Sequence, residues 1–149
     1  MLLGKLVLGG LLLGAAGTDM ASRRIPNKLI GVGLAAFLVL AAWLGYARET
    51  AVLRGCMMAG ALAFAIHLIP YMCKSMGAGD VKLSLVIGLL LGWEDWLGYL
   101  QIFCAVSLIV SCIVLIRAKK TKTKALPLAP VMAAAYFIYM CWNSIRFLL

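Results

Sequence analysis

The feature that most constrains this chain is a series of long apolar segments separated by short polar ones. Hydrophobic residues make up 65% of the 149 residues and charged residues only 13%, which is far from the composition of a soluble domain. A membrane-spanning helix needs roughly 20 mostly apolar residues. That length divides the chain into six predicted spans, at residues 2–20, 29–47, 53–73, 81–93, 95–116 and 127–148.

The predicted fold is an all-α membrane protein, a bundle of about six transmembrane helices in a single domain over residues 1–149. Backbone amides in hydrocarbon must be satisfied internally, and the segments lack the alternating pattern of a barrel. The fourth span, 81–93, is too short for a full crossing. Either it begins inside the loop from Gly77 to Asp80, or Glu94 and Asp95 lie within a tilted helical hairpin.

The basic residues predict which side of the bilayer each connection faces. Six spans place the connections after the first, third and fifth spans on one side, with ten of the 14 basic residues. The positive-inside rule makes that side cytoplasmic and both termini external, in a multi-pass protein of the cell membrane. A cleaved signal peptide at the start fits poorly, because basic residues directly after an apolar run resist translocation. These residues are Arg23, Arg24 and Lys28.

Two of the five acidic residues lie at the same predicted membrane face. Asp19 ends the first apolar run, and Asp80 follows Gly77-Ala78-Gly79 after the third, so two spans separate them. An acid at the edge of a membrane helix is by default a functional candidate. One ionised carboxylate can remove a proton from water while a neutral acid polarises a carbonyl. We therefore expect Asp19 and Asp80 to form a water-activating pair.

Several neighbours are candidates for shaping this pair. Gly77 and Gly79 permit positive φ and close approach of a substrate strand, although an ordinary turn explains glycines equally well. Asp80 is expected to begin a helix, with Lys82 adding positive charge nearby, so we expect Asp80 to be more often ionised than Asp19. Arg24 and its basic neighbours either fix topology or touch lipid and substrate, and topology is the better explanation.

The two Asp motifs together resemble the prepilin peptidases, which are membrane aspartic proteases of the Gly-x-Gly-Asp class. The motifs are Asp19-x-x-x-x-Arg24-x-Pro26-Asn27 and Gly77-Ala78-Gly79-Asp80-Val81-Lys82-Leu83, and the segment Pro127-Leu128-Ala129-Pro130 is similar too. The resemblance covers essentially the whole chain. It implies that Asp19 and Asp80 are catalytic and that the chain removes a short basic leader from prepilin-like single-helix membrane proteins at the cytoplasmic face.

The chain departs from the larger bacterial members of that family. They carry an additional cytoplasmic segment with paired cysteines, associated with methylation of the new pilin amino terminus. This sequence has neither the segment nor the pairs among its five cysteines. The resemblance therefore implies a short form with peptidase activity and without N-methyltransferase activity.

Other functions remain open on the residues alone. A small proton- or ion-coupled transporter would use the buried acids to bind ions. A nonenzymatic assembly partner and a broader intramembrane protease are further alternatives. No metal site or cofactor is expected, because no Cys-x-x-Cys pair occurs. The lysine cluster at 119–124 is short and lacks interleaved aromatics, which argues against nucleic-acid binding.

Three remaining features have structural explanations. His67 lies within an apolar segment and is expected to be a packed, hydrogen-bonded histidine. Glu49, Glu94 and Asp95 fall in predicted external turns, where solvated side chains are expected. Glycines spaced four apart, such as Gly88 and Gly92, favour close helix packing.

Overall fold

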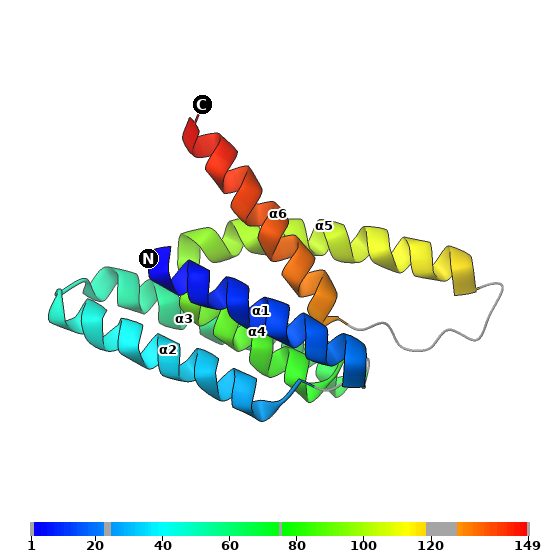
Figure 1. The fold of residues 1–149 in the computed structure, drawn as a ribbon, viewed down its shortest axis with the longest axis horizontal. Helices are drawn as coiled ribbons and strands as arrows, with labels where there is room; N and C mark the ends of the chain where they lie inside the picture. The colour runs from blue at the N-terminus through cyan, green and yellow to red at the C-terminus, as the bar shows by residue number, and fades with distance from the viewer. Residues whose placement is uncertain (1, 23–24, 75, 119–127, 149) are drawn as a thin grey trace.

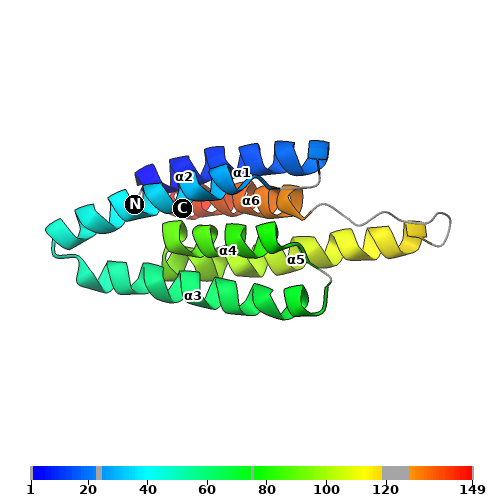
Figure 2. The same ribbon diagram turned by 90° about the horizontal axis from the view of Figure 1, so that it is seen from below.

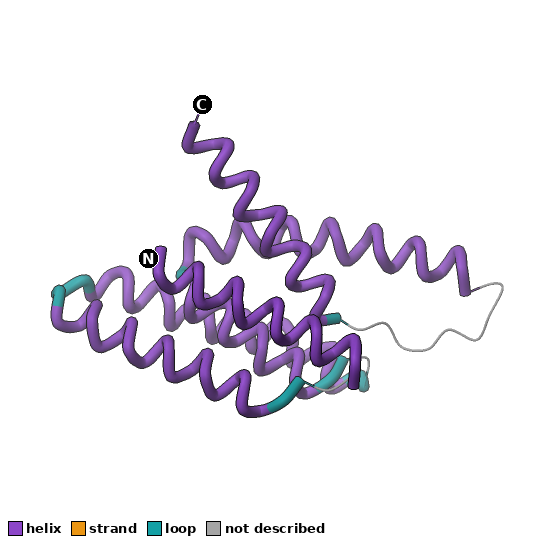
Figure 3. The backbone as a smooth tube through the Cα atoms, in the orientation of Figure 1, coloured by secondary structure: helices purple, strands orange, loops and turns teal. Residues whose placement is uncertain are grey.

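The computed structural model describes residues 2–22, 25–74, 76–118 and 128–148, and these ranges form six helices and no strand (Figures 1 and 3). The all-α prediction is confirmed, and the predicted spans match the helices to within three residues at each end. The helices are α1 (Leu2–Ser22), α2 (Asn27–Tyr46), α3 (Thr50–Met72), α4 (Ala78–Leu91), α5 (Trp93–Ala118) and α6 (Ala129–Leu148).

Three of these helices are long and apolar enough to cross a membrane, namely α2, α3 and residues 93–114 of α5. Their outer faces carry large exposed hydrophobic side chains, among them Leu38 on α2, Met57 on α3 and Leu108 on α5. Exposed apolar area on this scale is unusual for a soluble monomer. It suits a surface that faces lipid.

Helix α4 lies at the centre of the bundle. It has 14 residues, and at 1.5 Å per residue it is about 21 Å long, shorter than the hydrocarbon core. It contacts α1, α2, α3 and α5, and in Figure 2 it runs between α3 on one side and α1 on the other. Its side chains from Val86 to Leu91 are all buried. Over these residues α4 is apolar on every face, as is expected of a helix segment enclosed by protein.

The two expectations for the short fourth span are both met in part. Helix α4 begins at Ala78, inside the predicted loop, and Gly77 precedes it as the N-cap. Gly92 ends the helix with a φ of 77°, a conformation that favours glycine. The chain then enters α5 at once, so that Glu94 and Asp95 lie in the first turn of α5.

Small residues allow α3 and α4 to pack closely. A Cβ atom on Gly88 would lie 2.6 Å from the carbonyl oxygen of Ala59, and one on Gly60 would lie 2.6 Å from the Leu89 side chain. The expected packing role of Gly88 is therefore confirmed. Gly10 of α1 differs, because a Cβ there would meet nothing within 4 Å.

The helices alternate in direction, so the bundle has two distinct ends. The ends of α1 and α3 gather with the starts of α2, α4 and α6, as Figures 1 and 2 show at the right of each view. We call this the Asp19 end. The opposite end, which we call the Asp95 end, holds the start of α1, the start of α5 and the end of α6.

Candidate active site

Asp19 is buried near the carboxyl end of α1 and is 7% exposed. Its Oδ2 atom accepts a hydrogen bond of 3.2 Å from the backbone N–H of Ala129. Ala129 is the first residue of α6, so the N–H group is one of those that a helix start leaves without an internal partner. The positive end of the α6 dipole therefore points at the Asp19 carboxylate.

Asp80 lies in the first turn of α4, just before the apolar segment 81–93. Its Oδ1 atom is buried and has no hydrogen-bond partner among the described residues. Burial, together with the negative charge of nearby Asp19, raises the pKa of Asp80 to about 6, and a backbone hydrogen bond with Gly77 opposes this. The structure thus brings the two predicted acids into electrostatic contact at the Asp19 end.

The pKa of Asp80 shifts in the direction opposite to the one that its position at a helix start favours. The sequence favours an ionised Asp80 because Asp80 begins a helix, and it does begin one. Burial and the Asp19 charge outweigh that effect and raise the pKa of Asp80. A second helix start, that of α6, contacts Asp19 instead. Two helix N-termini, those of α4 and α6, lie at this site, and the sequence analysis used the one at Asp80.

The two glycines act through their small size and not through special backbone angles. Gly77 has a φ of −77°, and Gly92 is the glycine with positive φ in the described chain, so the expected positive φ is wrong. A Cβ on Gly77 would lie 3.2 Å from Asp80 Oδ2, and one on Gly79 would lie 3.1 Å from Ile25 Cβ. Gly79 therefore lets Ile25, which follows α1, pack onto the start of α4.

The basic candidates lie at the edge of the site. Lys82 is exposed, and its Nζ atom donates a hydrogen bond of 3.4 Å to Oδ1 of Asn27. This contact joins the starts of α4 and α2. Lys82 is not among the groups that shift the pKa of Asp80, so its expected charge effect is not found. Arg24 lies outside the described residues.

The model of the type IV leader peptidase family matches residues 6–119, a range that contains both acids and the loop before Asp80. This chain belongs to that family. Comparison with curated proteins and with solved structures gives no match. Family membership makes the chain a leader-peptidase-like protease in a membrane, and it implies prepilin-like substrates.

Behind Asp80, this leader peptidase family member has a buried polar band that the sequence did not single out. Ser84 lies one turn after Asp80 on α4, and its Oγ atom donates to the carbonyl of Val81 at 2.8 Å. The carbonyl of Ala63 on α3 accepts from both Ser84, at 3.4 Å, and Nδ1 of His67, at 2.8 Å. His67 is the packed, hydrogen-bonded histidine expected. Ser84 lies four residues after Asp80, a spacing that places both side chains on one face of a helix, and this spacing could have identified Ser84 from the sequence.

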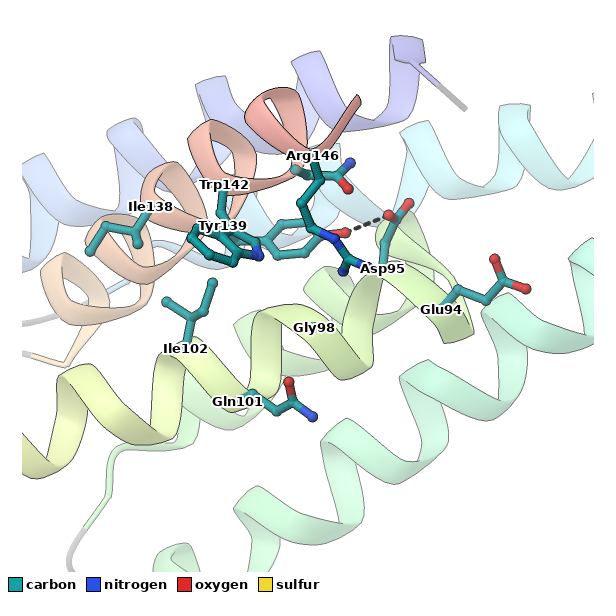
Figure 4. A pocket seen from close by; sticks show the side chains of 10 residues that line it. Glu94, Asp95, Gly98, Gln101, Ile102, Ile138, Tyr139, Trp142 and Arg146 are labelled. Carbon is teal, nitrogen blue, oxygen red and sulfur yellow. Dashed lines mark hydrogen bonds between the residues drawn. The ribbon is translucent and has the colours of Figure 1, made fainter. Parts of the chain in front are cut away.

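The Asp95 end of the protein also contains an acid, but one with close partners. Lys5 Nζ lies 2.7 Å from Asp95 Oδ2, and these side chains are 15% and 22% exposed. The Tyr139 hydroxyl donates to Asp95 Oδ1 (Figure 4), and the Tyr136 hydroxyl donates to the Lys5 carbonyl at 2.6 Å. The expectation of a solvated Asp95 is wrong, because Lys5 of α1 and Tyr139 of α6 both contact its carboxylate.

A cavity of about 450 Å³ adjoins this cluster, between the start of α5 and the end of α6. Figure 4 shows Tyr139 directed at Asp95 with Arg146 beside it. Glu94 also lines the cavity and is exposed. Lys5 and Tyr139 contact both oxygens of the Asp95 carboxylate. This carboxylate is therefore less free to bind water or exchange a proton than the acids at the Asp19 end.

Within the described residues, no group of three His, Cys, Asp or Glu side chains could hold a metal ion. The five cysteines are free thiols, with Cys56 buried and the other four exposed. The exposed ones are Cys73, Cys104, Cys112 and Cys141.

Proposed function

We propose that this protein is a membrane aspartic endopeptidase that removes the basic leader peptide from prepilin-like single-helix membrane proteins. Asp19 and Asp80 are its catalytic residues. The observation that carries the proposal is that two acids, from α1 and α4, lie near each other at one end of the bundle, and that a buried oxygen of Asp80 has no hydrogen-bond partner among the described residues. Membership of the type IV leader peptidase family supplies the substrate class.

The pair fits amide hydrolysis because the reaction needs two different carboxyl groups. Water is a weak nucleophile, so one carboxylate must remove its proton while a neutral acid polarises the scissile carbonyl. Two carboxylates held close together do not both ionise easily, and the shared proton supplies both forms at once. The raised pKa of Asp80, caused by burial and by Asp19, supports such sharing.

The proposed site faces the cytoplasm, in a multi-pass protein with both termini outside. This orientation rests on the basic connections that flank the Asp19 end, including Lys28, Lys74 and Lys82. A substrate inserted with its basic leader in the cytoplasm presents its leader junction at this depth. Helical peptide bonds are shielded, so the junction must be extended before attack. We expect no N-methyltransferase activity, because the sequence has no counterpart of the segment with paired cysteines that the larger members of the family carry.

The test is co-expression with a precursor that carries a basic leader before one apolar helix. Wild type should convert the precursor to the shorter form, and Asp19→Asn and Asp80→Asn should not. Glu49→Gln, at an exposed position of the Asp95 end, is the matched control for loss of one acid. Membrane insertion of each variant is measured alongside. Continued cleavage by both inserted Asn variants would overturn the mechanism, and an uncut precursor with proton flux through wild type would favour a transporter.

A further inference from the structure

We propose that the two acids have fixed and different roles, and that the backbone N–H of Ala129 positions Asp19 for its role. Asp19 is the ionised base, and Asp80 is the neutral acid that polarises the substrate. This inference rests on the proposed peptidase function and adds a group, the start of α6, that lies outside the region matched by the family model.

The surroundings of Asp19 stabilise its ionised form. A carboxylate that is 7% exposed has lost nearly all of its water, and it keeps its charge only if the protein supplies donors. The Ala129 N–H supplies one, at 3.2 Å, and hydrogen bonds to ionised groups are the stronger kind. Pro130, next in the chain, has no N–H to offer. The Ala129 N–H is therefore the one by which this helix start holds the acid.

The surroundings of Asp80 stabilise its neutral form. Its buried Oδ1 has no partner among the described residues, and leaving an oxygen unpaired costs less for a neutral acid than for an anion. The ionised Asp19 nearby adds repulsion to a second negative charge. An α4 N-terminus alone would favour an anion at Asp80, but desolvation and a neighbouring charge act in the opposite direction together.

These roles give a balanced reaction. Asp19 takes a proton from water as the water oxygen bonds to the scissile carbon, and Asp80 gives its proton to the carbonyl oxygen. The product is a neutral tetrahedral diol, with Asp19 protonated and Asp80 ionised. Asp19 then protonates the leaving nitrogen as the C–N bond breaks, and Asp80 recovers a proton from one hydroxyl of the diol. Both acids end in their starting states, and no other reactant is needed.

The experiment removes the Ala129 N–H, and its control weakens the same helix start without touching Asp19. Incorporating lactic acid at position 129 of the full chain, in lipid nanodiscs, replaces this N–H with an ester oxygen. The matched control is the corresponding ester at position 132, because the Met132 N–H donates to the Leu128 carbonyl at 3.0 Å within the same helix start. The ester at 132 loses this backbone hydrogen bond of α6, whereas the ester at 129 loses the hydrogen bond to Asp19.

The first readout needs no substrate. A carbodiimide reacts with protonated carboxyl groups, so peptide mass spectrometry reports how labelling of each acid depends on pH. In the unmodified protein, labelling of Asp80 should persist to higher pH than labelling of Asp19. The ester at position 129 should raise Asp19 labelling several-fold at pH 5, and the ester at 132 should leave it unchanged. Asp19 labelling that persists to higher pH than Asp80 labelling, or that ignores the 129 ester, overturns the proposal.

The second readout is cleavage of the precursor as a function of pH. The ester at position 129 should lower cleavage about tenfold or more, because hydrogen bonds to charged groups contribute on that scale. It should also move the acidic limb of the pH profile upward, which a general loss of helix stability would not do. A uniform loss with both esters identifies a structural role and refutes the assignment. Expected labelling in a protein that cleaves no precursor would contradict the peptidase function separately.

Discussion

The two ends of this bundle use acidic residues in opposite ways. At the Asp95 end, a lysine and a tyrosine hydroxyl both contact one carboxylate. At the Asp19 end, two carboxyl groups lie near each other. Among the described residues, Asp19 accepts a hydrogen bond from one backbone N–H, and one oxygen of Asp80 has no hydrogen-bond partner. Both sites are largely removed from water. They differ in whether a described cation pairs with the carboxylate, as Lys5 does with Asp95.

We expect this difference to separate a structural acid from a reactive one. A buried charge that is paired and hydrogen-bonded holds helices together but gains little from exchanging protons. A carboxyl group left incompletely paired keeps a proton that can be transferred, and perturbed groups of this kind gather at functional sites. The pairing of Asp95 therefore explains why this acid, in a polar cavity, is not the catalytic candidate.

The largest expected effect is on cleavage. Asp19→Asn and Asp80→Asn should each lower kcat by about 10² to 10⁴, the contribution of a positioned acid or base. Asp95→Asn should keep cleavage within about tenfold once its folded fraction is taken into account, because its position is at the opposite end of the helices. Precursor conversion per folded enzyme is the measurement. An Asp95→Asn loss as deep as that of Asp80→Asn would erase the contrast between the two ends.

The next effect is on stability at the Asp95 end. Lys5→Met leaves Asp95 without its cation and should lower the free energy of unfolding by about 2–3 kcal/mol, less than for a fully buried pair. The double variant Lys5→Met/Asp95→Leu should recover much of this loss, since apolar residues can replace a buried ion pair. Unfolding in mild detergent measures both. Equal stability of single and double variants would show that the ion pair contributes nothing.

A third prediction concerns the helix α4 that carries Asp80. Gly88→Ala should destabilise the protein by about 1–3 kcal/mol, because the added methyl group meets backbone atoms of α3 that cannot move aside. Gly10→Ala is the matched control on α1, where the methyl group meets open space and should stabilise the helix slightly. Thermal unfolding compares them. Identical melting of the two variants would argue against close α3–α4 packing.

The sequence was sufficient for the helices and for the meeting of the two acids. Apolar segment length gave the helix bounds, and the two spans between Asp19 and Asp80 placed both acids at one end. What it could not supply were contacts between distant segments. Ala129 lies 110 residues from Asp19, and nothing in the Asp19 motif points to it. Likewise, the partners of Asp95 come from α1 and α6, which are distant from it in the sequence. Its position next to a predicted turn indicated only a solvated side chain.

Helix α4 shows the same limit from another side. Its short apolar sequence left open whether it begins inside the loop from Gly77 to Asp80 or whether Glu94 and Asp95 lie within a tilted helical hairpin. Length and hydropathy are alike for a lipid-facing and a protein-enclosed segment. The tight contacts at Gly60 and Gly88 show that α4 packs closely against α3 and is enclosed by protein. The sequence does not distinguish these glycines from Gly10, where an added Cβ atom would meet nothing within 4 Å.

The smallest predicted effect is the pH dependence of stability, and it tests whether Asp80 holds its proton. Burial and the Asp19 charge raise the pKa of Asp80 from an ordinary 3.8 to about 6. The folded protein then binds more protons than the unfolded chain between these values, so stability is fully present below pH 3.8 and falls as pH rises through about 6. The melting temperature should therefore be lower at pH 8 than at pH 5.

Two variants sharpen this measurement, because each removes a different cause of the shift. Asp80→Asn abolishes the titrating group and should flatten the decline between pH 5 and pH 8. Asp19→Asn leaves burial in place but removes the neighbouring charge, so it should reduce the decline without abolishing it, since burial is the larger cause. An unchanged slope in Asp80→Asn would place the titration elsewhere. Complete flattening by Asp19→Asn would mean that the neighbouring charge, and not burial, keeps Asp80 protonated.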